Sequence, residues 1–223
     1  MPVSINTNLK PIIFIHTQKT AGHSIRVALE SVGYKWGTRL NKHDAPRDIH
    51  FLDQFISFAF VDNYLILKKV EYFSFAFVRN PFDACVSRFF YHHRKDKKNP
   101  QDLLFQRFPK NKDGFSSWIK SLKTDDCWTD DKYNWKDTFK TQKKFLSDDS
   151  NTKILVDFVG KYEQLNVDFQ KICNIIECDN NLKDIHINAS KRKSNYREYY
   201  DDDTIEIIES MYKEDLEYFN YEF

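Results

Sequence analysis

A short segment near the N-terminus combines the residue types that bind anions. It reads His16-Thr17-Gln18-Lys19-Thr20-Ala21-Gly22-His23-Ser24, with one lysine, one glycine and several hydroxyl side chains. The apolar run Ile12–Ile15 precedes it, and the helix-like stretch Ile25–Ser31 follows it. A loop between a strand and a helix directs backbone N–H groups and the positive end of the helix dipole at one point. We expect this loop to bind a phosphate or a sulfate, to which Lys19 adds a full positive charge.

The segment differs from the phosphate-binding loop of nucleoside triphosphatases. That loop has the pattern Gly-x-x-x-x-Gly-Lys-Ser/Thr, and its hydroxyl residue binds Mg²⁺. Here Lys19 precedes the only glycine of the loop, and no acidic strand that could hold a metal ion is evident downstream. A small P-loop kinase with a degenerate loop is one alternative. An ordinary strand–helix turn with a surface lysine is another.

A second cluster follows another apolar run, Phe73–Val78. Arg79 comes directly after this expected strand, and Asn80-Pro81 marks a turn because proline suits the first turn of a helix. The helix would continue over residues 84–91 and carry Ser87. An arginine at a strand end is a good bidentate anion ligand. Ligands of open α/β sheets bind at the carboxyl ends of the strands, so we expect one ligand with two separated anionic groups.

The two segments together resemble motifs of sulfotransferases that use 3′-phosphoadenosine 5′-phosphosulfate (PAPS). Residues 19–24 are similar to the 5′-phosphosulfate loop of that family, and residues 78–83 with Ser87 are similar to its 3′-phosphate element. The closest likeness is to the carbohydrate sulfotransferase group that includes heparan sulfate 2-O-sulfotransferase and its short bacterial members. Residues 42–45, 156–163 and 188–192 and the C-terminal segment also match. Gln18 and His23 stand where the family usually has Pro and Thr.

The resemblance implies a role for each matching residue. Lys19 would bind the 5′-phosphosulfate and oppose the charge that develops on the leaving phosphate, and His43 would be the catalytic base. Arg79 and Ser87 would bind the 3′-phosphate, and Lys191 or Arg192 would contact the same group. The full set expected to bind the nucleotide is Gln18, Lys19, Thr20, Ala21, Gly22, His23, Ser24, Arg79, Ser87, Lys191 and Arg192. PAPS would be the co-substrate, no metal would be needed, and the acceptor would be a hydroxyl of a carbohydrate or another molecule.

Strands that alternate with helices predict a central parallel sheet with right-handed crossovers. With the resemblance, this gives a P-loop-like, three-layer α/β/α fold and a single domain over residues 1–223, with an irregular acceptor-side insertion at about 96–150. We predict a helix over 49–60, a third strand over 153–159 and an amphipathic C-terminal helix. Trp118, Trp128 and Phe115 are expected to pack in the core, whereas His92 and His93 would line an acceptor cleft or lie exposed.

The composition excludes some function classes. Thirty-four Lys and Arg against 33 Asp and Glu give a net charge of +1, so no nucleic-acid binding is expected. The four cysteines have no CxxC spacing and predict buried free thiols in a reducing compartment. The first residues lack a signal-peptide core and no apolar run is long enough to span a membrane, so we expect a cytoplasmic enzyme. A non-catalytic nucleotide-binding module is a further alternative, because Gln18 and His23 depart from the family pattern.

Overall fold

The computed structural model describes residues 10, 12–34, 56–59, 72–93, 100–125, 128, 139–148, 150–178 and 195–223. The chain forms two compact units. The first unit comprises residues 1–78 and 142–189, and the second comprises residues 79–141 and 190–223. The chain first passes from the first unit to the second between Val78 and Arg79. Each unit is described by itself below.

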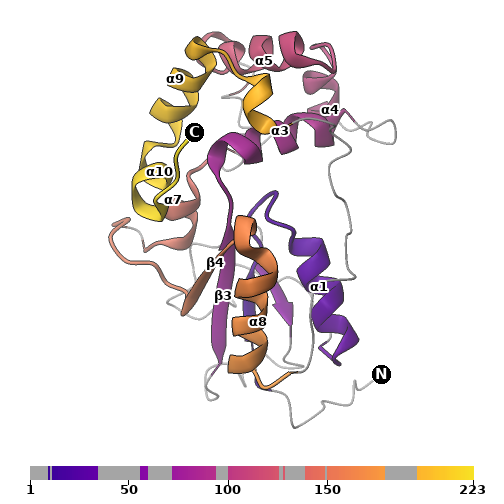
Figure 1. The fold of residues 1–223 in the computed structure, drawn as a ribbon, viewed down its shortest axis with the longest axis vertical. Coiled ribbons are helices and arrows are strands. Elements are labelled where there is room, and N and C mark those ends of the chain that lie inside the picture. The colour runs from indigo at the N-terminus through magenta and orange to yellow at the C-terminus, as the bar shows by residue number, and fades with distance from the viewer. Residues whose placement is uncertain are drawn as a thin grey trace. The chain divides into compact units, whose positions relative to one another are not determined.

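The first unit contains a four-stranded sheet in the order β2-β1-β3-β4 (Figure 1). Strands β1 (Ile12–Ile15), β3 (Phe73–Val78) and β4 (Phe158–Lys161) are parallel, as the alternation of strands and helices predicts. Strand β2 (Ile56–Ala59) pairs with β1 in the antiparallel direction. The predicted parallel sheet is therefore confirmed for three strands, and an antiparallel strand adds to its edge.

Two sequence-based assignments in this unit are wrong in part. Residues 56–59 were expected to be helical but form β2, because β1 offers them an open edge whose backbone groups must be paired. The third parallel strand begins at Phe158, not at residue 153. Just before it, the Asp157 carboxylate accepts hydrogen bonds from the backbone N–H and the hydroxyl of Ser74, each 2.7 Å long. Asp157 therefore contacts β3 through its side chain, and the backbone pairing between β3 and β4 begins at the next residue, Phe158.

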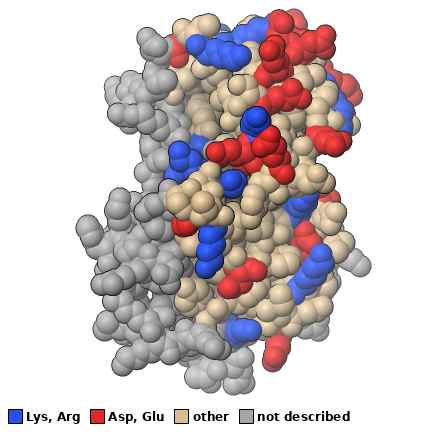
Figure 2. Space-filling view, turned by 90° about the vertical axis from the view of Figure 1, so that its left-hand side faces the viewer, with Lys and Arg blue, Asp and Glu red and all other residues tan. Residues whose placement is uncertain are grey.

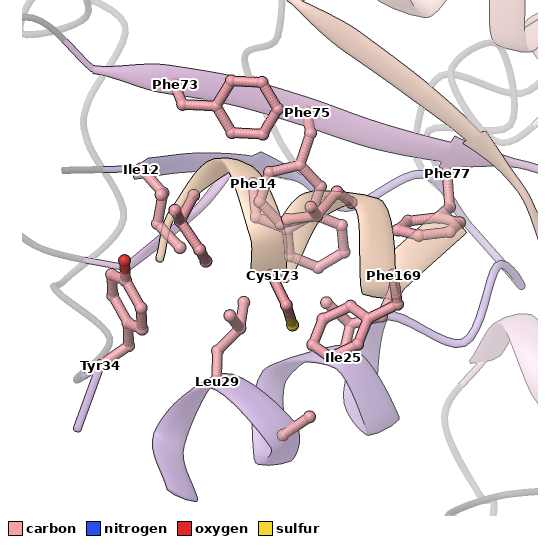
Figure 3. Close-up of a cluster of buried hydrophobic side chains, with 13 residues drawn as sticks. Ile12, Phe14, Ile25, Leu29, Tyr34, Phe73, Phe75, Phe77, Phe169 and Cys173 are labelled. Atoms are coloured by element: carbon pink, nitrogen blue, oxygen red, sulfur yellow. The ribbon is translucent and has the colours of Figure 1, made fainter. Parts of the chain in front are cut away.

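Helices α1 (Gly22–Ser31) and α8 (Leu165–Ile175) contribute to one apolar core with the sheet (Figure 3). Side chains alternate between the two faces of a strand, so Phe14, Phe75 and Phe77 point to the same side. The rings of Phe14 and Phe75 stack with centroids 5.0 Å apart. Both described helices in this core thus pack on one face of the sheet, and a three-layer arrangement stays a prediction. The 3₁₀ turn η4 (Tyr162–Gln164) and helix α7 (Gln142–Leu146) also belong to this unit.

The second unit is helical and its core is aromatic. It contains α3 (Pro81–His92), α4 (Pro100–Phe105), α5 (Lys112–Thr124), the 3₁₀ turn η5 (Tyr196–Tyr199), α9 (Asp202–Met211) and α10 (Lys213–Phe219). Phe115, Trp118 and Trp128 lie in its buried core, as predicted. The rings of Phe89 and Trp118 stack with centroids 5.6 Å apart. Aromatic packing of this kind needs no stacked sugar or adenine to explain these residues.

The C-terminal segment forms two amphipathic helices where we expected one. Asp201 and Thr204 build a capping box that starts α9, and the helix ends before Tyr212, whose ring is buried. Acidic side chains gather over this part of the surface (Figure 2). The exposed ones on α9 and α10 are Asp202, Asp203, Glu206, Glu209, Glu214 and Glu217. The apolar face of each helix turns inward, as the sequence pattern predicts.

Three cysteines lie within the described residues, and all three are free thiols. Cys85 and Cys173 are buried, which confirms the prediction for them, and Cys178 is half-buried. Burial raises the pKa of Cys85 to about 11, so its thiol is protonated at neutral pH. Cys127 lies outside the described residues. No described helix is long and apolar enough to cross a bilayer.

Candidate functional site

The segment between β1 and α1 has a backbone shape suited to anions. We call residues 18–24 the anion loop. Within it Lys19 and Ala21 both have left-handed backbone angles, with φ of 65° and 62°. Such angles cost an L-residue about 1–2 kcal/mol each, so the surrounding structure must hold them. Left-handed residues placed next to ordinary ones turn successive N–H groups to one side, and this forms a concave anion nest.

Two threonine hydroxyls hold this shape. The Thr17 hydroxyl donates to the carbonyl oxygen of Phe77 on β3, and it lies 2.9 Å from the Thr20 hydroxyl. Thr20 donates to the Thr17 carbonyl oxygen at 2.8 Å. Thr20 was expected to bind the nucleotide, but its side chain is fully buried and bonds within the loop. Only its backbone is therefore a candidate ligand, and Thr17 is a supporting residue that the sequence pattern did not single out.

Gly22, the first residue of α1, allows the loop to lie against His16. A Cβ atom at position 22 would be 2.0 Å from Cδ2 and 2.1 Å from Nε2 of the His16 ring. That ring also stacks on Phe14, with centroids 5.8 Å apart and planes 18° apart. These contacts make His16 a packing surface beneath Gly22. The glycine is thus needed for close approach to the ring.

The remaining residues of the anion loop differ in exposure. Gln18, Lys19 and Ala21 are half-buried, His23 is exposed and Ser24 is buried in the first turn of α1. The N-cap residue of α1 is Ala21, whose side chain makes no capping hydrogen bond, and the first turn of the helix follows directly after the left-handed Lys19 and Ala21. The loop therefore brings a lysine, a helix N-terminus and a concave backbone together, as the sequence predicts for an anion site.

The environment of His16 favours its neutral form. Burial, followed by the positive charges of Lys19, His23 and Arg26, lowers the pKa of His16 from 6.5 to about 4. The neutral imidazole leaves Lys19 without a charged histidine beneath the loop at neutral pH. A second positive charge there would repel Lys19 and strain the loop.

This pKa shift predicts a pH-dependent stability. Between about pH 6.5 and pH 4 the unfolded chain binds more protons than the folded protein, so stability falls as the pH falls. The loss is expected to reach about 3 kcal/mol. The His16→Phe variant keeps a flat ring but cannot titrate, so its unfolding free energy should lack this component. Urea unfolding of both proteins at pH 7 and pH 4.5 measures the difference, and equal pH dependences would contradict the assignment.

The second predicted anion segment starts the second unit. Asn80 caps α3 by accepting a 3.0 Å hydrogen bond from the Phe82 N–H, and Pro81 occupies the first helical position, as predicted. The Asn80 amide also donates to the Glu222 carbonyl oxygen at 2.7 Å. Arg79, just before this cap, is buried and paired with Asp83. Ser87 is buried farther along α3. The segment has the strand-end arginine and helix N-terminus that its sequence indicates.

Arg88 is a buried cation that the sequence pattern did not reveal. Its Nη1 donates to the Tyr212 hydroxyl at 3.4 Å, and its guanidinium carbon lies 5.2 Å from the centroid of the Phe139 ring. The phenol of Tyr212 and the thiol of Cys85 raise the pKa of Arg88, although burial alone would lower it. The contacts link α3 to the end of α9. They give Arg88 a structural role in the aromatic core.

His92 and His93 are both engaged within the second unit. The Nδ1 atom of His92 lies 2.6 Å from Oδ1 of Asp102, whose side chain is fully buried. The ring nitrogens of His93 lie 2.7 Å from the Phe89 carbonyl oxygen and 3.0 Å from that of Phe108. Neither histidine is fully exposed, and both connect the end of α3 to the α4 region.

Three predicted site residues lie outside the described part of the chain. They are His43, expected to be the base, and Lys191 and Arg192, expected near the 3′-phosphate. The residues that are described fall into two groups. Residues 18–24 belong to the first unit, and Arg79 and Ser87 belong to the second.

Comparison with known proteins supports the resemblance of this sequence to sulfotransferases. Residues 5–222 match the model of the family described as "Sulfotransferase family". An uncharacterized protein of Archaeoglobus fulgidus is 32% identical over 126 residues, which make up 56% of this chain and 83% of that protein. No solved structure gives a significant match. Because the family match includes both predicted anion segments and nearly all of the sequence, the chain belongs to the sulfotransferase family and is a transferase.

Proposed function

We propose that this protein transfers a sulfuryl group from PAPS to an acceptor hydroxyl, and that the acceptor is a carbohydrate. The observation that carries the proposal is the shape of the anion loop, in which left-handed Lys19 and Ala21 lie directly at the start of α1. Membership of the sulfotransferase family supports the donor. The carbohydrate acceptor, and kinship with the group that includes heparan sulfate 2-O-sulfotransferase, rest on the resemblance of the sequence motifs. So does the P-loop-like character of the fold, and a cytoplasmic location is a separate part of the proposal.

In this proposal the anion loop binds the 5′-phosphosulfate. The N–H groups around residues 20–24 and the Lys19 ammonium contact its oxygens, and the helix dipole of α1 adds positive potential. Arg79 and Ser87 bind the 3′-phosphate, with Lys191 or Arg192 completing the contacts. An arginine suits this role because its planar fork can donate two parallel hydrogen bonds to a phosphate.

The reaction is an in-line displacement at sulfur. The acceptor oxygen forms a bond to sulfur while the bond from sulfur to the bridging phosphate oxygen breaks, and His43 takes the proton of the acceptor hydroxyl. A neutral imidazole can accept that proton near pH 7. Negative charge grows on the bridging oxygen, where Lys19 opposes it. Preorganised charge of this kind stabilises the transition state more than the bound substrate.

Calorimetry with two nucleotides tests the donor. The protein should bind 3′,5′-diphosphoadenosine, the product left by PAPS, roughly tenfold or more tightly than it binds ATP with Mg²⁺. The reason is that the second anion segment needs a 3′-phosphate, which ATP lacks. Tighter binding of ATP, with no heat from the diphosphate, would instead favour a kinase. Incubation with sulfur-labelled PAPS and a set of glycans would then identify the acceptor by the molecule that carries the label.

A further inference from the structure

The arginine proposed to bind the 3′-phosphate is already held by an acid. The Nε atom of Arg79 lies 2.8 Å from Oδ2 of Asp83, and Nη2 lies 2.6 Å from the same oxygen. The side chains are 5% and 9% exposed, respectively. One carboxylate oxygen therefore accepts from two nitrogens on one edge of the guanidinium. Such a contact fixes the plane of the group as well as its position, because both N–H bonds lie in that plane.

Asp83 is itself held rigidly. It is the third residue of α3, one helical turn after Arg79, and the Asn80 cap and Pro81 set the direction in which this helix begins. An acidic side chain in the first helical turn is stabilised by the positive end of the helix dipole. The orientation of the guanidinium is thus set by the start of α3. Two of its five N–H groups point to Asp83. Because the guanidinium is planar and rigid, this contact also fixes the directions of the other three N–H groups.

The pair also changes what a phosphate encounters. A lone buried arginine would attract any anion, whereas the Arg79–Asp83 ion pair as a whole carries little net charge. Affinity for a phosphate must then come from well-aligned hydrogen bonds rather than from charge alone. Such a site favours a phosphate whose oxygens lie where the N–H groups of Arg79 point. It binds an anion in another position only weakly.

On the basis of the function proposed above, we infer that Asp83 is a positioning residue. It orients Arg79 for the 3′-phosphate and thereby sets how strongly the protein prefers nucleotides that carry this group. Asp83 does not touch the sulfuryl group or the acceptor. Its removal should therefore affect recognition of the 3′-phosphate and leave recognition of the rest of the nucleotide unchanged.

The test compares two ligands that differ only in the 3′-phosphate. They are 3′,5′-diphosphoadenosine and adenosine 5′-monophosphate, and calorimetry gives the ratio of their affinities. In Asp83→Ala the ratio should fall roughly tenfold through weaker binding of the diphosphate alone. Asp83→Asn keeps an oxygen that can accept from Arg79, so it should retain most of the preference. A purely structural defect would weaken both ligands alike and leave the ratio unchanged.

Asp113→Ala is a matched control for the loss of a first-turn acid. Asp113 lies in the first turn of α5, in the same unit, behind an asparagine cap, and it is exposed. This variant should keep the wild-type ratio. If Asp83→Ala does not fold, Arg79→Lys carries the test, because lysine keeps the charge but has no planar edge for Asp83 to hold. It should lose the preference to the same degree.

The outcomes separate this inference from the proposed function. A wild-type protein with no preference for the diphosphate would refute the 3′-phosphate site itself. A wild-type preference that survives in folded Asp83→Ala, or in Arg79→Lys when the alanine variant does not fold, would leave the proposed function intact and overturn the role of Asp83.

Discussion

Replacement of Lys19 by alanine is expected to lower the rate of sulfuryl transfer by about 100- to 1,000-fold. The half-buried Lys19 lies in the concave backbone at the start of α1, where the bridging oxygen of the donor would gain charge. Loss of the ammonium removes a preorganised positive charge from that position. Because the charge on the oxygen grows towards the transition state, turnover should fall by a larger factor than nucleotide affinity. Initial rates with labelled PAPS, together with calorimetry, measure both effects.

Lys10→Ala is the control for this prediction. Lys10 belongs to the same unit and its side chain is exposed. Its described tie to the fold is a 2.8 Å hydrogen bond from the Tyr34 hydroxyl to its backbone carbonyl oxygen, which the substitution retains. The control should therefore keep the wild-type rate. If Lys19→Ala keeps it too, charge stabilisation at the leaving oxygen must come from another residue.

Gly22→Ala is expected to destabilise the protein by about 1–3 kcal/mol and to weaken nucleotide binding strongly. The added methyl group would lie 2.0 Å from the His16 ring, so either that ring or the start of α1 has to move. The ring stacks on Phe14, and the loop is tied to β3 through Thr17. A shift of α1 would move the N–H groups that are proposed to bind the phosphosulfate.

A double-mutant cycle checks the cause of the Gly22 effect. His16→Ala removes the ring, so Gly22→Ala should cost much less stability in that background than in the wild type. Thermal unfolding gives the stability difference, and calorimetry with 3′,5′-diphosphoadenosine shows whether the loop recovers. Equal costs in both backgrounds would mean that the ring is not what excludes the methyl group. The substitution would then act through the backbone at the first position of α1.

The elements that carry the site were predictable because local patterns specify them. The continuous apolar runs before His16 and Arg79 are the β1 and β3 strands. The Asn80-Pro81 pair starts α3 where its cap chemistry requires. Strand β2 was missed, since its pairing with β1 depends on an edge that lies about 40 residues away in the chain. The third parallel strand was found but begins later than its apolar pattern suggests.

By itself, the sequence predicted two anion-binding segments and placed each one correctly between the end of a strand and the start of a helix. Residue type and spacing are enough for that, because capping and periodicity act within a few residues. Only the tertiary structure decided how the segments are supported. Thr17 bonds to β3 across a separation of 60 residues, and Gly22 fits because the His16 ring turns beneath it. Asp83 holds Arg79 because the start of α3 brings the two side chains together. The Thr17 contact depends on a distant partner, and the other two depend on side-chain directions, which residue type and spacing alone do not fix.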